Sequence, residues 1–226
     1  MGTYPAFTAT ICSNVLGVSI FEIMELFNSE DLLNTNLDLK DADVIYFPAF
    51  LSSSAANSYF NKLYADTPWQ QDDIKLFGKV YPQPRLTALY GNNDRSYSYS
   101  GIVMNPMPFT PLLLEIKDKV EKVPDVKFTT VLLNLYRDGN DSNGWHSDDE
   151  KELGQDPVIA SISLGAKRRF QMRHKKDKSL RTNIELEHGS LLLMKGSTQH
   201  YWQHQLPKSK RITEPRINLT FRIIAS

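Results

Sequence analysis

Polar and apolar residues alternate strictly in the last part of the chain, from Glu214 to Ile223. A period of two predicts a β-strand with two different faces. One face carries the polar residues Arg216, Asn218, Thr220 and Arg222, and the other carries Ile217, Leu219, Phe221 and Ile223. The apolar face can pack into a core. The polar face needs either solvent or a buried polar partner.

A second strand with a polar side precedes the middle of the chain. In Leu132–Tyr136, Asn134 and Tyr136 fall on the same side, and the segment leads almost directly to His146. Two such strands suggest a closed or nearly closed β structure that holds a polar ligand inside. An anion is the expected guest, because two arginine forks on one strand face suit a dicarboxylate.

Short strands dominate the chain after Lys127, and glycines separate them. The predicted strands are Phe128 to Tyr136, Val158 to Leu164, Arg169 to Arg173, Asn183 to Leu186, Ser190 to Met194 and Ile217 to Ile224. Two helices are expected earlier, one capped at Ser52–Ser54 and ending near Tyr64, and one from Thr110-Pro111 to about Val123. A further partly helical stretch is expected around Ser19 to Phe27. The chain is therefore predicted to be mainly β with flanking helices (α+β).

Composition sets limits on this picture. A chain of 226 residues with 41% hydrophobic content can bury a substantial core as one domain. Cys12 is the only cysteine, so no intrachain disulfide can form and a reducing intracellular location is expected, cytoplasmic in a bacterium or nuclear in a eukaryote. No stretch has the length of a membrane span, and no Lys or Arg precedes Lys40 to start a secretory signal.

The formal charge of zero conceals an asymmetry. Residues 1 to 50 contain seven acidic residues and one basic residue, so the remainder carries a positive excess. The basic residues concentrate at Lys167, Arg168, Arg169, Arg173, His174, Lys175, Lys176, Lys178 and Arg181, and again at Lys208, Lys210 and Arg211. Such a run is either a solvated hairpin or a surface that contacts the phosphates of a nucleic acid.

Two histidines and one carboxylate have the spacing of a metal site. His146 and Asp148 form an H-x-D pair, and His204 follows fifty-eight residues after His146. An isolated H-x-D occurs often by chance in solvated loops. With His204, however, these residues can bind one face of Fe(II) and leave positions open for a cosubstrate and dioxygen, as in non-haem iron oxygenases. A structural zinc site would leave no position open.

Several further motifs give the chain a family resemblance. It resembles the AlkB-type Fe(II)- and 2-oxoglutarate-dependent dioxygenases, which reverse alkylation damage in nucleic acids, over about Tyr46 to Ile224. The motifs that carry the resemblance are Pro84-Arg85-Leu86-Thr87, Tyr97-Ser98-Tyr99-Ser100-Gly101, Asn134-Leu135-Tyr136, Trp145-His146-Ser147-Asp148-Asp149-Glu150 and the Arg216 to Arg222 strand. The resemblance implies a double-stranded β-helix, or jelly roll, with helices on one side. Leu89 departs from the pattern, since relatives often carry tryptophan there.

The resemblance also implies the roles of the site residues. Fe(II) would be held by His146, Asp148 and His204. 2-Oxoglutarate would be held by Asn134, Tyr136, Arg216, Asn218 and Arg222. Residues 44 to 226 would form the catalytic domain, with substrate recognition between about 69 and 101, and residues 1 to 43 would be an N-terminal extension of unassigned role.

Four residues are candidates for the substrate side. Tyr99 would stack on a base that has left the helical stack, and Arg85 would hold a nearby phosphate. Phe77 either fills the gap left by that base or packs in the core. Asp149 either attracts a cationic methylated base or is a surface residue paired with Lys151. Trp145 has no role that the sequence suggests.

The implied reaction is oxidative demethylation of 1-methyladenine and 3-methylcytosine in DNA, or in RNA, by a monomer that uses Fe(II), 2-oxoglutarate and dioxygen. Two alternatives stay open at this point. A related oxygenase would use the same iron site on RNA, protein or lipid. A non-catalytic nucleic-acid-binding protein would keep the fold without turnover.

Overall fold

The structure is a computed structural model that describes residues 34–76, 79–92, 97–99 and 102–224. By its internal contacts the chain divides into Met1–Leu32 and Leu33–Ser226, and the description below concerns the second unit. The helix expected around Ser19 to Phe27 and the candidate residue Phe77 lie outside the described residues. Within the described part, no helix is long and apolar enough to cross a membrane.

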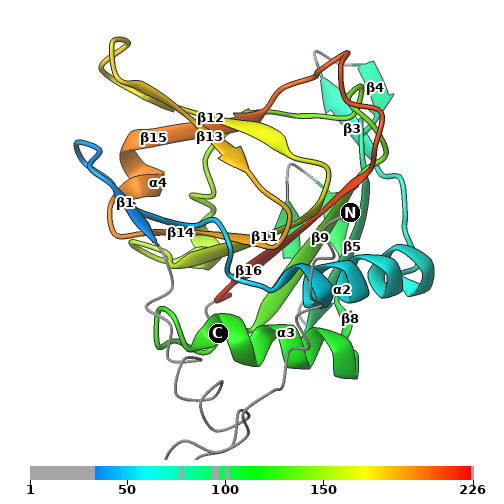
Figure 1. Cartoon of the computed structure of the whole chain (residues 1–226). Coiled ribbons are helices and arrows are strands. Elements are labelled where there is room, and N and C mark those ends of the chain that lie inside the picture. The colour runs from blue at the N-terminus through cyan, green and yellow to red at the C-terminus, as the bar shows by residue number, and fades with distance from the viewer. Residues whose placement is uncertain (1–33, 77–78, 93–96, 100–101, 225–226) are drawn as a thin grey trace, which may run out of the picture. The chain divides into compact units, whose positions relative to one another are not determined.

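Eight strands of the described chain form the larger of two facing sheets (Figure 1). In order across the sheet they are β1 (Thr35–Leu37), β2 (Asp43–Phe47), β14 (Ser190–Lys195), β11 (Ile159–Gly165), β16 (Arg216–Arg222), β9 (Thr130–Tyr136), β5 (Leu86–Gly91) and β8 (Met107–Pro108). Neighbouring strands are antiparallel except β5 and β8. β1 falls within the predicted N-terminal extension and pairs with β2, and the domain boundary near residue 43 stays a prediction.

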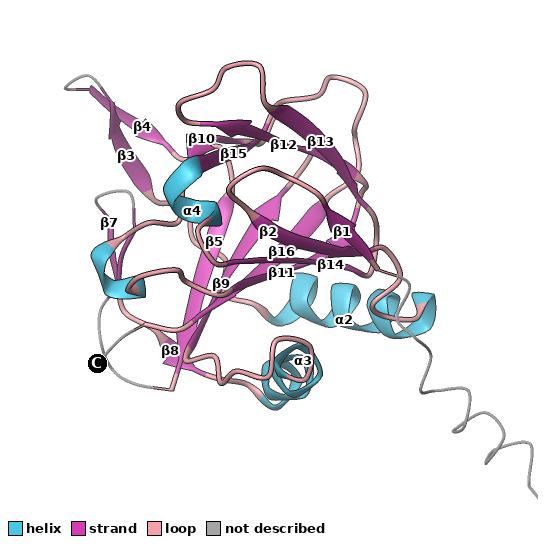
Figure 2. Cartoon of the chain, turned by 90° about the vertical axis from the view of Figure 1, so that its left-hand side faces the viewer, coloured by secondary structure: helices cyan, strands magenta, loops and turns pink. Residues whose placement is uncertain are grey.

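Four strands of the described chain form the second sheet, which faces the first (Figure 2). Their order is β10 (Asn143–His146), β15 (Trp202–Leu206), β12 (Arg168–His174) and β13 (Arg181–Leu186). Two separate hairpins flank the sheets, β3 (Asp73–Leu76) with β4 (Lys79–Pro82) and β6 (Tyr97–Tyr99) with β7 (Ile102–Met104). Two facing, mostly antiparallel sheets are the jelly roll that the sequence predicted.

Two longer helices lie along the outer side of the eight-stranded sheet, α2 (Ser53–Asp66) and α3 (Pro111–Glu121) (Figures 1 and 2). Their predicted caps are confirmed. Ser52 Oγ accepts the Ala55 N–H at 3.3 Å, and Thr110 Oγ1 accepts the Leu113 N–H at 3.2 Å. Each cap satisfies an N–H that the first helical turn leaves without a partner. A short α4 (Thr198–Tyr201) and a 3-10 turn η1 (Lys151–Leu153) complete the helical elements of the described chain.

The predicted period of two in the last strand is confirmed, and both faces of the strand are buried. All seven residues of β16 and all seven of β9 are buried, because β16 lies between β11 and β9 in the middle of the sheet. The apolar face packs on the helix side, where Phe221 contacts Phe128. The polar face therefore lies between the two sheets and not in solvent. Polar side chains in such a place need partners there.

Candidate active site

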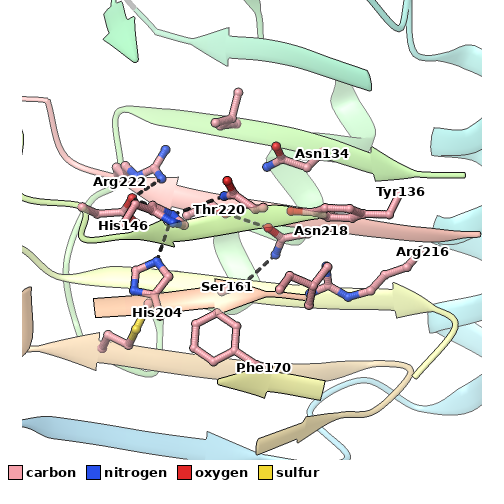
Figure 3. A pocket seen from close by; sticks show the side chains of 15 residues that line it. Asn134, Tyr136, His146, Ser161, Phe170, His204, Arg216, Asn218, Thr220 and Arg222 are labelled. Carbon is pink, nitrogen blue, oxygen red and sulfur yellow. Dashed lines mark hydrogen bonds and ion pairs between the residues drawn. The ribbon is translucent and has the colours of Figure 1, made fainter. Parts of the chain in front are cut away.

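Strand pairing brings the predicted metal ligands together. His146 ends β10 and lies opposite His204 of β15, and Asp148 follows in the next loop. The two histidine Nε2 atoms are 3.1 Å apart, and His146 Nε2 lies 3.8 Å from Asp148 Oδ1 (Figure 3). One ligand atom from each residue lies within 4.8 Å of the others, and no other group of this kind occurs in the described residues. One metal ion fits this geometry.

The protonation states of the three residues also suit a metal. Burial lowers the pKa of His146. Burial and the adjacent His146 ring lower the pKa of His204 to about 3. Both rings are therefore neutral near pH 7. His146 Nδ1 lies 2.8 Å from the Gly144 carbonyl oxygen, which can only accept a hydrogen bond. The proton is therefore on Nδ1, and the Nε2 lone pair faces His204 and Asp148.

Asp148 is held as a carboxylate by its neighbours. Burial alone would raise its pKa, but Arg222, His204 and His146 together lower the pKa to about 2. Arg222 contributes a direct ion pair, with Nη2 at 3.0 Å from Asp148 Oδ1, and both residues are buried. The predicted cosubstrate residue Arg222 thus contacts the metal carboxylate directly. It joins the metal ligands to the polar face of β16.

A pocket between the two sheets extends from these ligands along β16 and β9 (Figure 3). The register pairs Arg216 with Tyr136 and Asn218 with Asn134, so the two polar faces predicted from the sequence meet. All five residues predicted to hold 2-oxoglutarate line this pocket, together with the three predicted metal ligands. The structure thus brings the two predicted sets into one pocket.

The far end of the pocket carries a buried positive charge without an anionic partner. Arg216 is 2% exposed, and its Nη2 donates to Ser163 Oγ at 2.8 Å. Its Nε has no hydrogen-bond partner, and no carboxylate of the described residues lies within ion-pair distance of Arg216. Burial, with the nearby charge of Arg168, lowers the pKa of Arg216 to about 10. A buried guanidinium in this state fits a carboxylate ligand.

Tyr136 is held between two arginines in this region. The guanidinium carbon of Arg216 lies 5.3 Å from the ring centroid, and that of Arg168 lies 5.7 Å from it. Arg168 is 1% exposed and donates to the carbonyl oxygens of Asp138, Asp141 and Pro207 at 3.1, 2.8 and 2.9 Å. The Tyr136 ring is thus fixed in orientation beside the unpaired charge.

Two of the asparagines that line the pocket, Asn134 and Asn218, are anchored by protein groups. Asn218 Nδ2 donates to Ser161 Oγ at 2.7 Å and to the Ile162 carbonyl oxygen at 3.0 Å. Asn134 Oδ1 accepts from Arg85 Nε at 2.8 Å. Arg85 also donates to the Ser142 carbonyl oxygen at 3.4 Å and is 4% exposed. We therefore revise the predicted phosphate contact of Arg85, since a phosphate at the surface would not reach this side chain.

Asp149 is not part of the His-Asp-His group. Its carboxylate is 48% exposed, and its Oδ2 lies 2.9 Å from Lys175 Nζ. The ion-pair partner is thus Lys175 and not Lys151, which the sequence suggested because it is closer along the chain. Tyr99 belongs to the backbone of β6, but its side chain, like Phe77, is outside the described residues.

Trp145 acquires a partner that the sequence did not suggest. The guanidinium carbon of Arg173 lies 4.1 Å from the Trp145 ring centroid, and Arg173 also donates to Gln203 Oε1 from Nε and Nη2 at 3.1 and 2.9 Å. Trp145 and Gln203 are next to the ligands His146 and His204 in sequence. Side chains alternate along a strand, so this cluster covers the outer side of the sheet behind the ligands.

The sequence reasoning missed several residues of the pocket. Ser161 and Ser163 of β11 hold Asn218 and Arg216, and Phe170 of β12 stacks on His204 with ring centroids 5.1 Å apart. The two serines alternate with Ile162 and Leu164, so the period of two could have identified a third polar face. Phe170 offered no such signal, because an aromatic residue in a strand most often packs in the core.

Non-haem iron oxygenases that use a 2-oxo acid combine three features of this structure. These are the jelly roll, the His-Asp-His group and a buried arginine without an anionic partner. The sequence profile of the 2OG-Fe(II) oxygenase superfamily matches residues 43–222. The chain belongs to the AlkB-type family within this superfamily. Its jelly-roll fold and its predicted family are thereby confirmed.

Individual relatives agree with this family. The alpha-ketoglutarate-dependent dioxygenase alkB homolog 3 of Bos taurus is 45% identical over 191 residues, which cover 78% of this chain and 64% of that protein. The human DNA oxidative demethylase ALKBH2 is 44% identical over 158 residues, which cover 67% of this chain and 60% of that protein. The chain thus spans less than two thirds of the length of these relatives.

A solved structure shows the same fold at low sequence identity. The structure of OsALKBH1 superposes with a TM-score of 0.58 at 16% identity, covering 84% of this chain and 100% of that one.

Leu89, which departs from the family pattern, is buried with Leu132, Leu153 and Ile224. These apolar neighbours fill the space around the smaller side chain.

Proposed function

We propose that this protein demethylates N-alkylated bases, 1-methyladenine and 3-methylcytosine, in DNA, with RNA as a second possible polymer. The observation that carries the proposal is one pocket with a His-Asp-His group near one end and the unpaired Arg216 guanidinium at the other. The names of two relatives support the substrate class, since one is called a DNA oxidative demethylase and another an alkB homolog.

His146, Asp148 and His204 would hold Fe(II), and 2-oxoglutarate would lie between the metal and Arg216. With dioxygen, bound Fe(II) and 2-oxoglutarate would supply an oxidant that hydroxylates the N-methyl carbon of the base. In the overall reaction, methylated base, 2-oxoglutarate and O2 become restored base, formaldehyde, succinate and CO2. Arg216 would pair with the distal carboxylate of 2-oxoglutarate. Tyr136 and the anchored amides of Asn134 and Asn218 would fix its orientation. Arg222 keeps Asp148 ionised.

A basic groove on the second sheet supports a polyanionic substrate. Its lining includes Lys167, Arg169, Lys208, Lys210 and Arg211. Lys167 and Arg169 already pair with glutamates, but the other three are exposed and have no acidic partner among the described residues. Phosphate contacts from such groups give affinity that does not depend on sequence.

The loop that carries these three cations is fixed in place. Gly139 donates to the Ile212 carbonyl oxygen and its own carbonyl accepts from Ser209, both at 2.8 Å, while Arg168 binds the Pro207 carbonyl oxygen. A Cβ at Gly139 would lie 1.8 Å from the Ser209 carbonyl oxygen, so only glycine permits this approach. The backbone of that loop therefore needs no ordering when the groove binds a polyanion.

Asp149 would add discrimination for the damaged base. Methylation at these ring nitrogens makes the base cationic near neutral pH, and an exposed carboxylate beside the metal loop attracts that charge. Lys175 balances Asp149 in the free protein. A cationic base can replace Lys175 as the positively charged partner of Asp149, whereas a neutral base cannot.

The proposal is tested by incubating the protein with Fe(II), 2-oxoglutarate and oligonucleotides that carry 1-methyladenine or 3-methylcytosine. Single-stranded and double-stranded DNA and RNA are compared, and the products are weighed by mass spectrometry. We expect loss of one CH2 from at least one DNA substrate, with one succinate formed per methyl group removed. No loss from any oligonucleotide would refute the proposal.

Two histidine variants make this assay specific. His204→Ala removes a proposed metal ligand and should abolish the mass change. His200→Ala is the matched control, because His200 lies four residues earlier on the surface beside Asp156 and should keep activity. Tight DNA binding without 2-oxoglutarate consumption would favour the non-catalytic alternative. Turnover of 2-oxoglutarate with a protein or lipid, but with no nucleic acid, would favour the other oxygenase.

A further inference from the structure

The loop that carries Asp148 is held by one short segment on the other side of the site. The Asp148 N–H donates to Gln199 Oε1 at 3.0 Å, and Ser147 Oγ donates to the Trp202 carbonyl oxygen at 3.0 Å. Lys175 Nζ bridges the next residue to the same segment, with Asp149 Oδ2 at 2.9 Å and the Gln199 carbonyl oxygen at 2.8 Å. Three consecutive residues of the loop are therefore bonded, directly or through Lys175, to 199–202.

Gln199 is the most deeply buried member of this set. Its side chain is 0% exposed, although glutamine is seldom fully buried. Its Nε2 faces Met194 Sδ at 3.6 Å, and a thioether is a weak acceptor. Among the described residues, the only strong hydrogen bond of this amide is thus the one in which Oε1 accepts the Asp148 N–H. That donor also fixes the orientation of the amide, since Oε1 and not Nε2 must face it.

The segment is itself firmly anchored. Thr198 Oγ1 donates to the Lys195 carbonyl oxygen at 2.6 Å and accepts the Asp43 N–H at 2.9 Å, which joins α4 to the ends of β14 and β2. Trp202 Nε1 donates to the Lys40 carbonyl oxygen at 2.8 Å. His204 follows on β15, opposite His146. One rigid segment therefore carries one proposed ligand and fixes the backbone of another.

We propose that Gln199 is a positioning residue for the metal carboxylate. It fixes the backbone at Asp148, so that the carboxylate faces the two imidazoles before the metal arrives. No group of Gln199 is offered to the metal, and its effect passes entirely through Asp148. The inference rests on the proposed metal site. Groups that orient a ligand in this way typically change metal affinity by about tenfold to a hundredfold.

The test compares Gln199→Met with Gln205→Met. Methionine keeps the length of the side chain and removes the acceptor, and it suits the neighbouring Met194. Gln205 is the matched control, because it lies on the adjoining β15 and bonds to Gln171 on the outer side. Mn(II) binding to the metal-free protein is followed by the electron paramagnetic resonance of free Mn(II). We expect at least about tenfold weaker binding for Gln199→Met, and unchanged binding for Gln205→Met.

A second measurement needs no metal, and its first part needs no variant. Amide hydrogen exchange at Asp148 in the metal-free wild-type protein should be slow, and Gln199→Met should accelerate it selectively. Exchange at the rate of an exposed loop amide in the wild type would overturn the inference, even if the variant failed to fold. Mn(II) affinity of Gln199→Met equal to that of Gln205→Met would also overturn it.

Failure of the proposed function gives a different pattern. If the wild-type protein bound no Mn(II), or if His204→Ala bound it unchanged, the proposed metal site would be wrong. The exchange rate at Asp148 would then decide separately whether Gln199 holds this loop.

Discussion

Acid should destabilise the metal-free protein through His204, and the effect can be worked out from the structure. Burial and the neighbouring His146 lower the pKa of His204 from 6.5 to about 3. As pH falls below 6.5, the unfolded chain takes up a proton at this residue, while the folded protein does not. The folded state therefore loses stability as pH falls from 6.5 towards 3.

The size of the effect follows from proton linkage. One such histidine should cost about 1 kcal/mol of unfolding free energy between about pH 7 and about pH 5.5. His146 has a lowered pKa as well and adds a loss in the same direction. Asp148 acts in a separate window, since its pKa of about 2 lies below the ordinary 3.8, and the stability it contributes is lost only as pH falls below 3.8.

Urea unfolding of the metal-free protein at the two pH values measures this loss. His204→Phe removes the titrating ring and keeps an aromatic side chain against Phe170. Its loss of stability should therefore be smaller by about 1 kcal/mol than that of the wild type. Phe170→Leu is the matched control, because it disturbs the same packing without removing a titrating group, and it should keep the wild-type loss. Equal losses in the wild type and His204→Phe would refute the reasoning.

Three further predictions concern the pocket and the surface. Arg216→Met should raise the KM for 2-oxoglutarate at least about thirtyfold, equivalent to about 2 kcal/mol for a buried charge pair. The urea stability of the free protein should not fall, because the lost charge has no anionic partner among the described residues. An unchanged KM would contradict the role of Arg216. Asp149→Asn should raise the KM for 1-methyladenine about fivefold, because about 1 kcal/mol of Coulomb attraction in water is lost. The KM for the neutral base 3-methylthymine should stay unchanged. Equal changes for both bases would exclude charge recognition by Asp149. Replacing Lys208, Lys210 and Arg211 together by alanine should reduce the slope of log binding constant against log salt for DNA by about two to three, and a slope equal to that of the wild type would remove this groove from the binding surface.

The strands with a clear period of two could be predicted from the sequence. β16 and β9 show this period because the side that faces the other sheet is polar, while the side that faces the helices is apolar. β5 could not be predicted in this way. Its residues after Leu86 are all buried, and a short apolar run does not distinguish a strand from a buried helix.

The metal ligands could be predicted, but the contacts around them could not. Residue type and spacing are enough to suggest His146, Asp148 and His204, since few side chains bind a metal. The partners of Arg85 and Asp149 depend on which strands lie side by side. Lys175, for example, reaches Asp149 from twenty-six residues away in the sequence. Sequence neighbours such as Lys151 are therefore poor guesses for the partner of a loop carboxylate.

The charges inside the barrel point to function and not to stability. Arg216 and Arg222 are buried on one strand face. Arg222 pairs with Asp148, whereas no carboxylate of the described residues pairs with Arg216. A fold selected for stability alone would gain from apolar side chains at Arg216, because a buried charge without a partner costs more than it contributes. A metal dication by itself would add to the excess of positive charge in the pocket, whereas a dicarboxylate would reduce that excess. We therefore expect the proposed Fe(II) and 2-oxoglutarate to bind together, because the two charges of the dianion balance those of the metal and one of its carboxylates pairs with Arg216.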